Sequence, residues 1–260
     1  MKTIKMMRIC LKLRQDRYFG KIMLEHGGSQ MLGIIGAMEV EVEKLRAKMT
    51  ETEMKTVAGM NFCKGKLEGK DVVIVRSGIG KVNAGICSQI LVDLYQVDGI
   101  VNTGIAGSLR NEINIGDLVL STMAVQHDVD AGGFGYPVGE IPQLGVKEFP
   151  ADERLLTLAE EACREANPDI STFKGRVASG DQFIDSKEKK KWICDTFDAY
   201  CAEMEGAAVA QAAYLNKIPY LIVRAISDKA DDSAHMDYGE FETKAVEHSV
   251  NLMLALVKRL

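Results

Sequence analysis

The segment 199–228 constrains the possible folds more than any other part of this sequence. A short strand-like run ends in Glu-Met-Glu (203–205), and an Ala-rich stretch with high helix propensity follows over 206–215. The next run, 220–223, is apolar throughout, as in a strand buried on both faces of a sheet, and it stops at Arg-Ala-Ile-Ser-Asp (224–228). Because ligands bind beyond the carboxyl ends of strands in open α/β sheets, the two charged clusters mark a candidate site, with solvated turns as the alternative.

Strands and helices alternate through the rest of the chain. Helical spacing places Ile86, Ile90, Leu91 and Leu94 on one face of the predicted helix 82–95. Glycine-rich stretches after three strands, the last of them 102–107, are expected to form turns at the rim of one pocket. This order predicts a single three-layer α/β domain with a central mixed, parallel-rich, twisted sheet flanked by helices. Its strands are expected at 32–37, 60–67, 71–77, 99–101, 117–125 and 173–179, and its other helices at 38–48, 152–166 and 238–260.

The composition limits the partners that we expect. The chain has 260 residues, 47% of them hydrophobic, which suits one domain with a full core. No apolar run approaches the roughly 20 residues that span a bilayer, so no membrane partner is expected. The six cysteines are scattered without a CxxC pair, which indicates reduced thiols in a cytoplasmic protein, and the four histidines lack the spacing of metal ligands.

Residues 1–30 differ from the rest. They hold seven Lys and Arg against Asp16 and Glu25, a net charge of +5, whereas the whole chain carries −5 and residues 31–260 therefore −10. We interpret 1–30 as a basic extension, either artificial or due to a start upstream of Met31, with an organelle address as the alternative. The acidic remainder is a poor nucleic-acid binder.

The segment 126–150 is too long and too glycine-rich for a simple connector, so we expect a functional loop or an interface. It carries Phe134, Tyr136, Ile141 and Leu144, and these apolar groups need a surface to cover.

The chemistry at the predicted strand ends is acidic. The sequence has no GxSxG elbow, no Walker A motif and no Cys–His pair by spacing, and the strand–Gly–helix start at 33–36 is not a GxGxxG dinucleotide motif. What remains is carboxylates, glycine turns and the aromatic Phe183 beside a turn. Carboxylates suit general acid–base catalysis and hydroxyl recognition, and an aromatic ring suits stacking on a planar base, so the combination points to a nucleoside.

Seven motifs carry a family resemblance. The stretches GIIGAMEVEV (33–42), SGIGKVNA (77–84), VNTGIAG (101–107), FGY (134–136), SGDQFI (179–184), EMEGAAVA (203–210) and VRAISDKAD (223–231) resemble those of the 5′-methylthioadenosine/S-adenosylhomocysteine nucleosidases of the nucleoside phosphorylase superfamily. They run in family order over nearly all of 31–260. The resemblance implies a nucleoside phosphorylase-like fold, hydrolysis of the N-glycosidic bond to adenine and a 5-thio-substituted ribose in methionine salvage, and no cofactor or metal.

The resemblance also implies roles. Asp228, oriented by Ser227, would protonate adenine N7. Glu41 would be the general base on the attacking water, with Arg224 close to that water. Glu205 would bind ribose hydroxyls. The implied substrate-binding set is Ile79, Ile105, Ala106, Gly107, Phe183 (stacked on adenine), Ile184 (its backbone at the adenine edge), Glu203, Met204 (against the sugar), Glu205 and Tyr238.

The resemblance further implies a homodimer in which the loop 126–150 closes the partner's pocket through Phe134, Tyr136 and Pro142. At Ile105 the family more often carries Ser or Thr, so the backbone donor is kept but a hydroxyl is lost.

Two alternatives stay open: a purine nucleoside phosphorylase, which would need cations around phosphate, and a non-catalytic nucleoside-binding relative.

Overall fold

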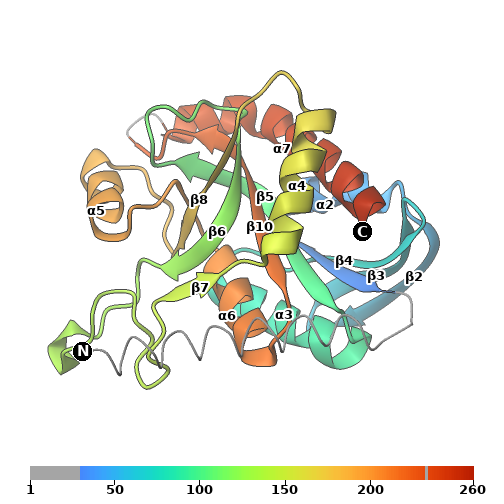
Figure 1. Cartoon of the computed structure of the whole chain (residues 1–260), viewed down its shortest axis with the longest axis horizontal. Coiled ribbons are helices and arrows are strands. Elements are labelled where there is room, and N and C mark those ends of the chain that lie inside the picture. The colour runs from blue at the N-terminus through green and yellow to red at the C-terminus, as the bar shows by residue number, and fades with distance from the viewer. Residues whose placement is uncertain (1–29, 232–233) are drawn as a thin grey trace, which may run out of the picture.

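The computed structural model describes residues 30–231 and 234–260, so most of the predicted extension 1–30 lies outside the described residues. Helices lie on both sides of a central sheet (Figure 1). The elements in chain order are β1 (Met31–Gly36), α2 (Glu39–Arg46), β2 (Thr50–Val57), β3 (Met60–Leu67), β4 (Lys70–Arg76), α3 (Lys81–Tyr95), β5 (Gly99–Ser108), β6 (Leu118–Gln126), the 3-10 turn η1 (Gly132–Phe134), β7 (Glu148–Pro150), α4 (Glu153–Ala166), β8 (Thr172–Ser179), α5 (Lys187–Phe197), β9 (Cys201–Glu203), α6 (Gly206–Asn216), β10 (Tyr220–Asp228) and α7 (Ala234–Arg259).

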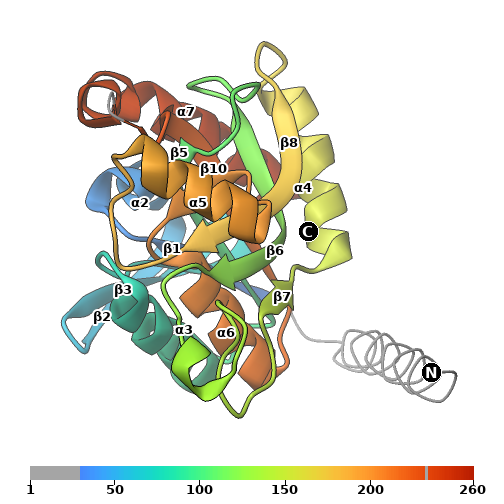
Figure 2. The same ribbon diagram turned by 90° about the vertical axis from the view of Figure 1, so that its left-hand side faces the viewer.

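The strands form one mixed sheet in the order β10-β6-β8-β9-β5-β1-β4-β3-β2, and β7 pairs with β6. Because β10 also pairs with β5, five strands (β5, β10, β6, β8 and β9) close into a ring, and β1, β4, β3 and β2 extend from it as an open sheet (Figure 2). The strands β4, β1, β5 and β10 are mutually parallel neighbours at the centre, whereas β2, β3 and β7 are joined by antiparallel pairs. The predicted mixed α/β fold is therefore confirmed.

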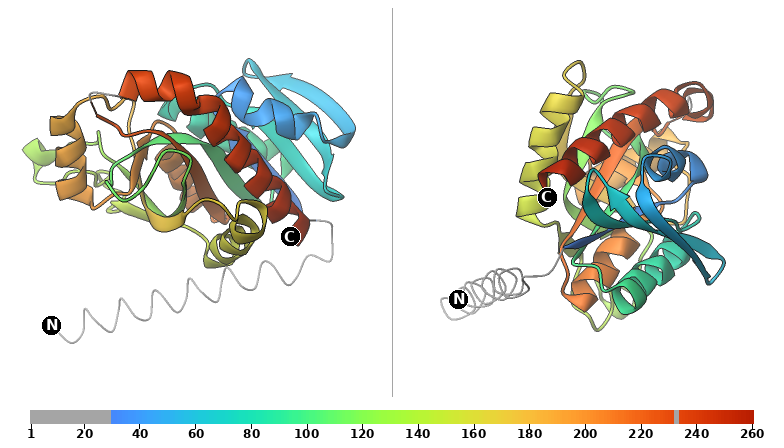
Figure 3. Two further views of the ribbon diagram at one scale, coloured as in Figure 1. Left: turned by 90° about the horizontal axis from the view of Figure 1, so that it is seen from above. Right: turned by 90° about the vertical axis from the view of Figure 1, so that its right-hand side faces the viewer.

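Two helical layers cover the sheet. The helices α2, α4 and α7 share one hydrophobic core with the sheet, and α7 lies across that face (Figure 3). On the other face, α3 and α6 pack through small side chains such as Ala84, Cys87 and Ala210. These layers place the carboxyl ends of the central parallel strands at one side of the domain.

Four local predictions differ from the structure. The stretch 102–107 is not a turn: it belongs to β5, all ten residues of which are buried. The run 220–223 continues as β10 through Asp228. The exposed, mostly polar edge strand β2 has no counterpart in the prediction. The strands that flank α6 run in opposite directions, because β9 is antiparallel and β10 parallel to β5.

The predicted apolar face of α3 is only partly buried. Leu91 is buried, but Ile86 and Leu94 are exposed, and the helix instead buries Ala84, Cys87 and Ser88 against α6 and the sheet. Small residues face inward because the neighbouring helix α6 is itself Ala-rich and lies close. The larger apolar residues therefore point to solvent in the protomer.

Candidate active site

A pocket of about 300 Å³ opens at the carboxyl ends of β1, β5 and β10. Its lining comes from six separate segments of the chain and contains four carboxylates. The lining residues are Ala37, Met38, Glu41, Ile79, Ile105, Ala106, Gly107, Phe183, Ala202, Glu203, Met204, Glu205, Ser227 and Asp228.

Backbone N–H groups hold the carboxylate of Glu41 in place. Glu41 lies in the first turn of α2, and its Oε2 accepts hydrogen bonds from the backbone N–H groups of Ala37 at 2.6 Å and Met38 at 2.9 Å. Its Oε1 accepts the N–H of Ile105 in β5 at 3.2 Å, so the backbone donor expected at this position is present. Burial raises the pKa of Glu41, against the lowering effects of the Arg224 charge and of these N–H groups. A carboxylate with a raised pKa is a stronger base.

Gly104 has no side chain because Glu41 occupies that space. A Cβ added at Gly104 would lie 2.6 Å from Glu41 Oε1 and 3.4 Å from Arg224 Nη1. Gly107 likewise leaves space for Asp228, because a Cβ added at Gly107 would lie 2.6 Å from Asp228 Oδ1. The glycines of β5 thus serve the close approach of two carboxylates and not a turn. Gly104 and Gly107 are three positions apart in the strand, so the two carboxylates approach β5 at points roughly 10 Å apart.

Asp228 is buried at the end of β10. The Ser227 hydroxyl donates to its Oδ2 at 2.9 Å, and the Ala230 N–H donates to its Oδ1 at 2.7 Å. The pairing of β10 with β5 shifts register between Ile226 and Asp228, and a bulge of this kind re-aims side chains. As a result, Ser227 and Asp228 both line the pocket although they are adjacent in the strand.

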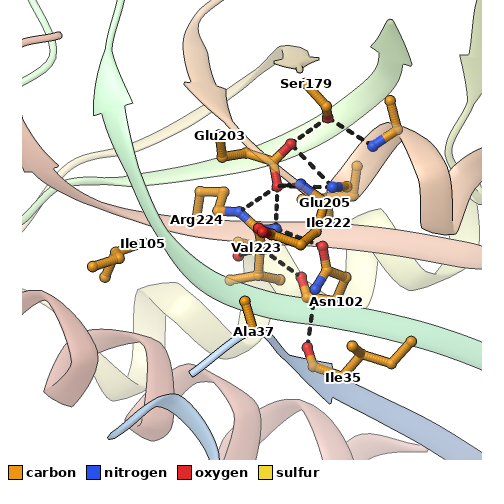
Figure 4. Close-up of polar contacts among 12 residues, drawn as sticks. Ile35, Ala37, Asn102, Ile105, Ser179, Glu203, Glu205, Ile222, Val223 and Arg224 are labelled. Carbon is orange, nitrogen blue, oxygen red and sulfur yellow. Dashed lines mark hydrogen bonds and ion pairs between the residues drawn. The ribbon is translucent and has the colours of Figure 1, made fainter. Parts of the chain in front are cut away.

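Arg224 joins the two charged clusters that the sequence separates (Figure 4). It extends from within β10 to Glu203, donating from Nε at 3.2 Å and from Nη2 to the same Oε2. Its other N–H groups donate to Asn102 O at 3.1 Å, Val223 O at 3.0 Å and Asn102 Oδ1 at 2.5 Å. These bonds use all five N–H groups of a guanidinium. Burial opposes the charge, but the carboxylates of Glu203, Glu205 and Glu41 outweigh it and raise the pKa of Arg224.

Glu203 is saturated by donors from the protein. Besides Arg224, its carboxylate accepts the Ser179 hydroxyl and the backbone N–H groups of Glu205 at 3.2 Å and Gly206 at 2.8 Å. These two N–H groups lie at the start of α6, so Glu203 caps that helix from the preceding strand.

Glu205 has fewer partners. Its Oε1 accepts the N–H of Gly80 at 2.7 Å. Burial, followed by the negative charge of Glu203, raises the pKa of Glu205 to about 8. Near neutral pH this carboxyl is therefore mainly protonated, and it can both donate and accept a hydrogen bond.

Phe183 and Ile184 follow β8 in the chain. The Phe183 ring is 42% exposed and lines the pocket, whereas the Ile184 side chain is buried in a separate apolar cluster. Met204 lies between the two acidic residues of β9 and α6 and lines the same pocket. Ile105 directs its side chain away from the Arg224 network (Figure 4) and into the core beneath α7.

The structure brings together most of the predicted site residues. Arg224 and Ile184 lie behind the lining, and the side chain of Tyr238 is outside the described residues. Phe134, Tyr136 and Pro142 do not line the pocket of their own protomer. Asn102 and Ser179 were missed: each hydrogen-bonds another polar side chain of the site, and both stand within the motifs singled out above.

The pocket is strongly acidic. None of its described lining residues is Lys, Arg or His, and among the side chains that the structure describes no three His, Cys, Asp or Glu are grouped as around a metal ion. The described helices include none that is long and apolar enough to cross a membrane.

Comparison with known proteins places this geometry in a family. A model of the Phosphorylase superfamily matches residues 31–258. The chain is 40% identical over 230 residues to the 5′-methylthioadenosine/S-adenosylhomocysteine nucleosidase of Bacillus thuringiensis (strain Al Hakam), an alignment that covers 88% of this chain and 99% of that protein.

Two solved structures have a fold similar to that of this chain. The nucleosidase of the same name from Neisseria meningitidis, in complex with methylthio-immucillin-A, superposes with a TM-score of 0.86 at 35% identity and covers 89% of this chain and 100% of that one. The futalosine hydrolase of Helicobacter pylori strain 26695 superposes with a TM-score of 0.84 at 34% identity and covers 89% of this chain and 98% of that one.

Proposed function

The chain belongs to the phosphorylase superfamily and, within it, to the 5′-methylthioadenosine/S-adenosylhomocysteine nucleosidases, and we propose that Glu41 and Asp228 carry out its reaction from two ends of the pocket. The enzyme hydrolyses the N-glycosidic bond of 5′-methylthioadenosine and S-adenosylhomocysteine to adenine and a 5-thio-substituted ribose. The observation that carries the assignment of roles is the approach of two buried carboxylates to β5 at points roughly 10 Å apart, in a pocket that Phe183 also lines.

Asp228 is the general acid in this proposal. Departure of a base from ribose develops oxocarbenium charge on the sugar and negative charge on the leaving nitrogen ring, so protonation of adenine N7 lowers the barrier. The Ser227 hydroxyl and the Ala230 N–H fix both oxygens of Asp228, which orients the proton toward the base.

Glu41 is the general base in this proposal and takes a proton from water as the water attacks the anomeric carbon. Three backbone N–H groups fix its carboxylate, which leaves it little freedom to move away from the reacting atoms. Arg224 has no N–H group left for the water, so we assign it an electrostatic role: its charge limits the rise in the pKa of Glu41 and balances Glu203.

The remaining lining residues bind substrate in this proposal. Protonated Glu205 exchanges hydrogen bonds with the ribose hydroxyls, Met204 packs on the sugar, and Phe183 stacks on adenine. Glu203 acts through Arg224 and the start of α6, because its oxygens already accept protein donors.

The test is to incubate the protein with 5′-methylthioadenosine, with and without phosphate, and to identify the sugar product. We expect free 5-methylthioribose and adenine at a rate that phosphate does not change. A sugar 1-phosphate and an obligate need for phosphate would instead identify a phosphorylase. Because a futalosine hydrolase shares the fold, futalosine belongs in the same assay as a competing substrate.

We also propose a homodimer. Four exposed apolar side chains, Ile79, Val82, Ile86 and Leu94, follow helical spacing along α3 and the turn before it. Contiguous apolar stripes of this kind mark interaction surfaces. Phe134 is 89% exposed at η1, whereas Ile141 and Leu144 of the same loop are partly buried against their own protomer. In this arrangement Phe134, Tyr136 and Pro142 reach the 5′-substituent end of the partner's pocket.

The proposed location is the cytoplasm, since all described cysteines are free thiols. The proposed catalytic unit is 31–260, and removal of residues 1–30 is expected to leave kcat unchanged.

A further inference from the structure

Three charged residues from separate elements form a closed ring of hydrogen bonds beside the pocket. The Lys81 ammonium at the start of α3 donates to Asp128 Oδ1 at 2.6 Å, and the Asp181 backbone N–H donates to Asp128 Oδ2 at 2.9 Å. The Lys81 backbone N–H donates to Asp181 Oδ1 at 2.8 Å and closes the ring. We call these three residues the Lys81 ring. The ring ties the start of α3 to the chain just after β6 and just after β8.

Two members of the Lys81 ring lie close in the chain to residues that line the pocket. Ile79 precedes Lys81 by two residues, and Phe183 follows Asp181 by two residues; both line the pocket. Between Ile79 and Lys81, the Gly80 N–H donates to Glu205. The position of three groups that face the nucleoside therefore depends on the two turns that the ring connects.

The ring is partly buried, and Gly80 packs closely against it. The side chains of Lys81 and Asp128 are only 17% and 16% exposed. Gly80 has a φ of +96°, which favours glycine, and a Cβ there would lie 3.0 Å from Asp181 Oδ1. Burial acts against ionised Asp128, but the bonds from Lys81 and Asp181 outweigh it and hold the pKa of Asp128 below its usual value. Asp128 therefore stays ionised near neutral pH.

The ring is also connected to α6, the helix that packs beside α3. The Lys81 ammonium donates a second bond to Gln126 Oε1 at 2.9 Å, and the Gln126 amide donates to Gln211 Oε1 in α6 at 2.5 Å. The Lys81 ammonium donates to Asp128 and Gln126, and Lys81 is not among the residues that line the pocket. A direct contact with substrate is therefore not the role that its geometry favours.

We propose that Lys81 is a positioning residue: through Asp128 and Asp181 it holds the Ile79 turn and the Phe183 turn at the separation that accepts a purine nucleoside. This inference rests on the proposed function for the identity of the substrate. It adds a determinant of substrate affinity that does not touch the substrate.

The first test compares Lys81→Met, Asp128→Asn and the control Lys191→Met in hydrolysis of 5′-methylthioadenosine. Lys191 pairs with Asp195 at 2.8 Å on the exposed face of α5, so its variant removes an ion pair of similar length that belongs to neither turn. For both ring variants we expect KM to rise on the order of tenfold with kcat within about threefold of wild type, because the walls bind ground state and transition state alike. An unchanged KM, or a loss confined to kcat, would overturn the proposal.

The second test does not depend on activity. Hydrogen exchange of the ligand-free protein should be faster at 77–84 and at 179–184 in both ring variants, and unchanged there in Lys191→Met. If the wild type hydrolyses no nucleoside, the proposed function fails while exchange still tests the ring. Faster exchange at one turn only, at neither, or equally throughout the domain in both variants would refute a specific connection between the two turns.

Discussion

Gly104→Ala is the most direct test of the role of Glu41. The added Cβ would lie 2.6 Å from Glu41 Oε1, whereas ordinary van der Waals contact begins at 3.4 Å, so the carboxylate must move by about 0.8 Å. Three N–H bonds oppose that movement, and one of them comes from the neighbouring Ile105. Because a misplacement of about 1 Å can cost on the order of 10²-fold in rate, we expect kcat to fall about 100-fold, equivalent to about 2.7 kcal/mol in the barrier.

The assay is release of adenine from 5′-methylthioadenosine, with thermal unfolding as the measure of folding. Gly85→Ala in α3 is the matched control, since a Cβ there meets nothing within 4 Å, and it should keep wild-type kcat. Gly104→Ala should also add little to the loss caused by Glu41→Gln, because both act on one group. A folded Gly104→Ala variant within threefold of wild-type kcat, or losses that simply add in the double variant, would refute the reasoning.

Three further predictions concern single groups. Asp228→Asn keeps a hydrogen bond to the base but delivers no proton, so kcat should fall about 10²–10⁴-fold while adenine still binds; more than half of wild-type kcat would remove Asp228 from the acid role. The pKa of Glu205 is raised from 4.5 to about 8, so its stabilising contribution is full below pH 4.5 and is lost as pH rises toward 8. Glu205→Gln should therefore gain stability relative to wild type across that interval, by up to about 1.4 kcal/mol per pH unit in urea unfolding, and a constant difference would contradict the raised pKa. Phe134→Ala should raise KM for 5′-methylthioadenosine without lowering the unfolding midpoint, and an unchanged KM would confine the loop to a structural role.

The sequence was sufficient to predict that the site residues lie close together, because they follow buried strands. The apolar runs of β1 and β10 are continuous, and the acidic or polar residues that end each run have no other place in a core. The seven motifs then supplied roles for these residues. The pocket accordingly contains Glu41, Glu205 and Asp228 together, as expected.

The glycines of β5 misled the prediction for a physical reason. Glycine permits both a turn and the close approach of another group, and sequence alone does not distinguish these uses. In β5 the groups that approach are Glu41 and Asp228, 63 and 121 positions away in the chain, so only the folded arrangement reveals them. The Lys81 ring was missed in the same way, because its members are 47 and 100 positions from Lys81.

The apolar periodicity of α3 did not indicate whether its apolar face lies in the core or at the surface. Ile86 and Leu94 repeat at helical spacing, which normally indicates the core. In this protein the core position is taken by Ala84 and Cys87, which allow α6 to pack closely. An apolar stripe outside a filled core is the pattern of a surface that another chain covers.

The preference for water over phosphate follows from what already occupies the anion-binding groups. The start of a helix is a natural phosphate site because its backbone N–H groups are free. At α2 the N–H groups of Ala37 and Met38 are instead taken by the Glu41 carboxylate, an anion built into the chain. Arg224, the nearest cation, uses its five N–H groups on Glu203, Asn102 and Val223. A phosphate dianion beside the anomeric carbon would thus lie near the fixed Glu41 carboxylate, and none of these N–H groups would be free to bind it. The repulsion between the two anions has a Coulombic cost that neutral water does not incur. In the proposed mechanism, the same carboxylate that disfavours phosphate is the base that activates water.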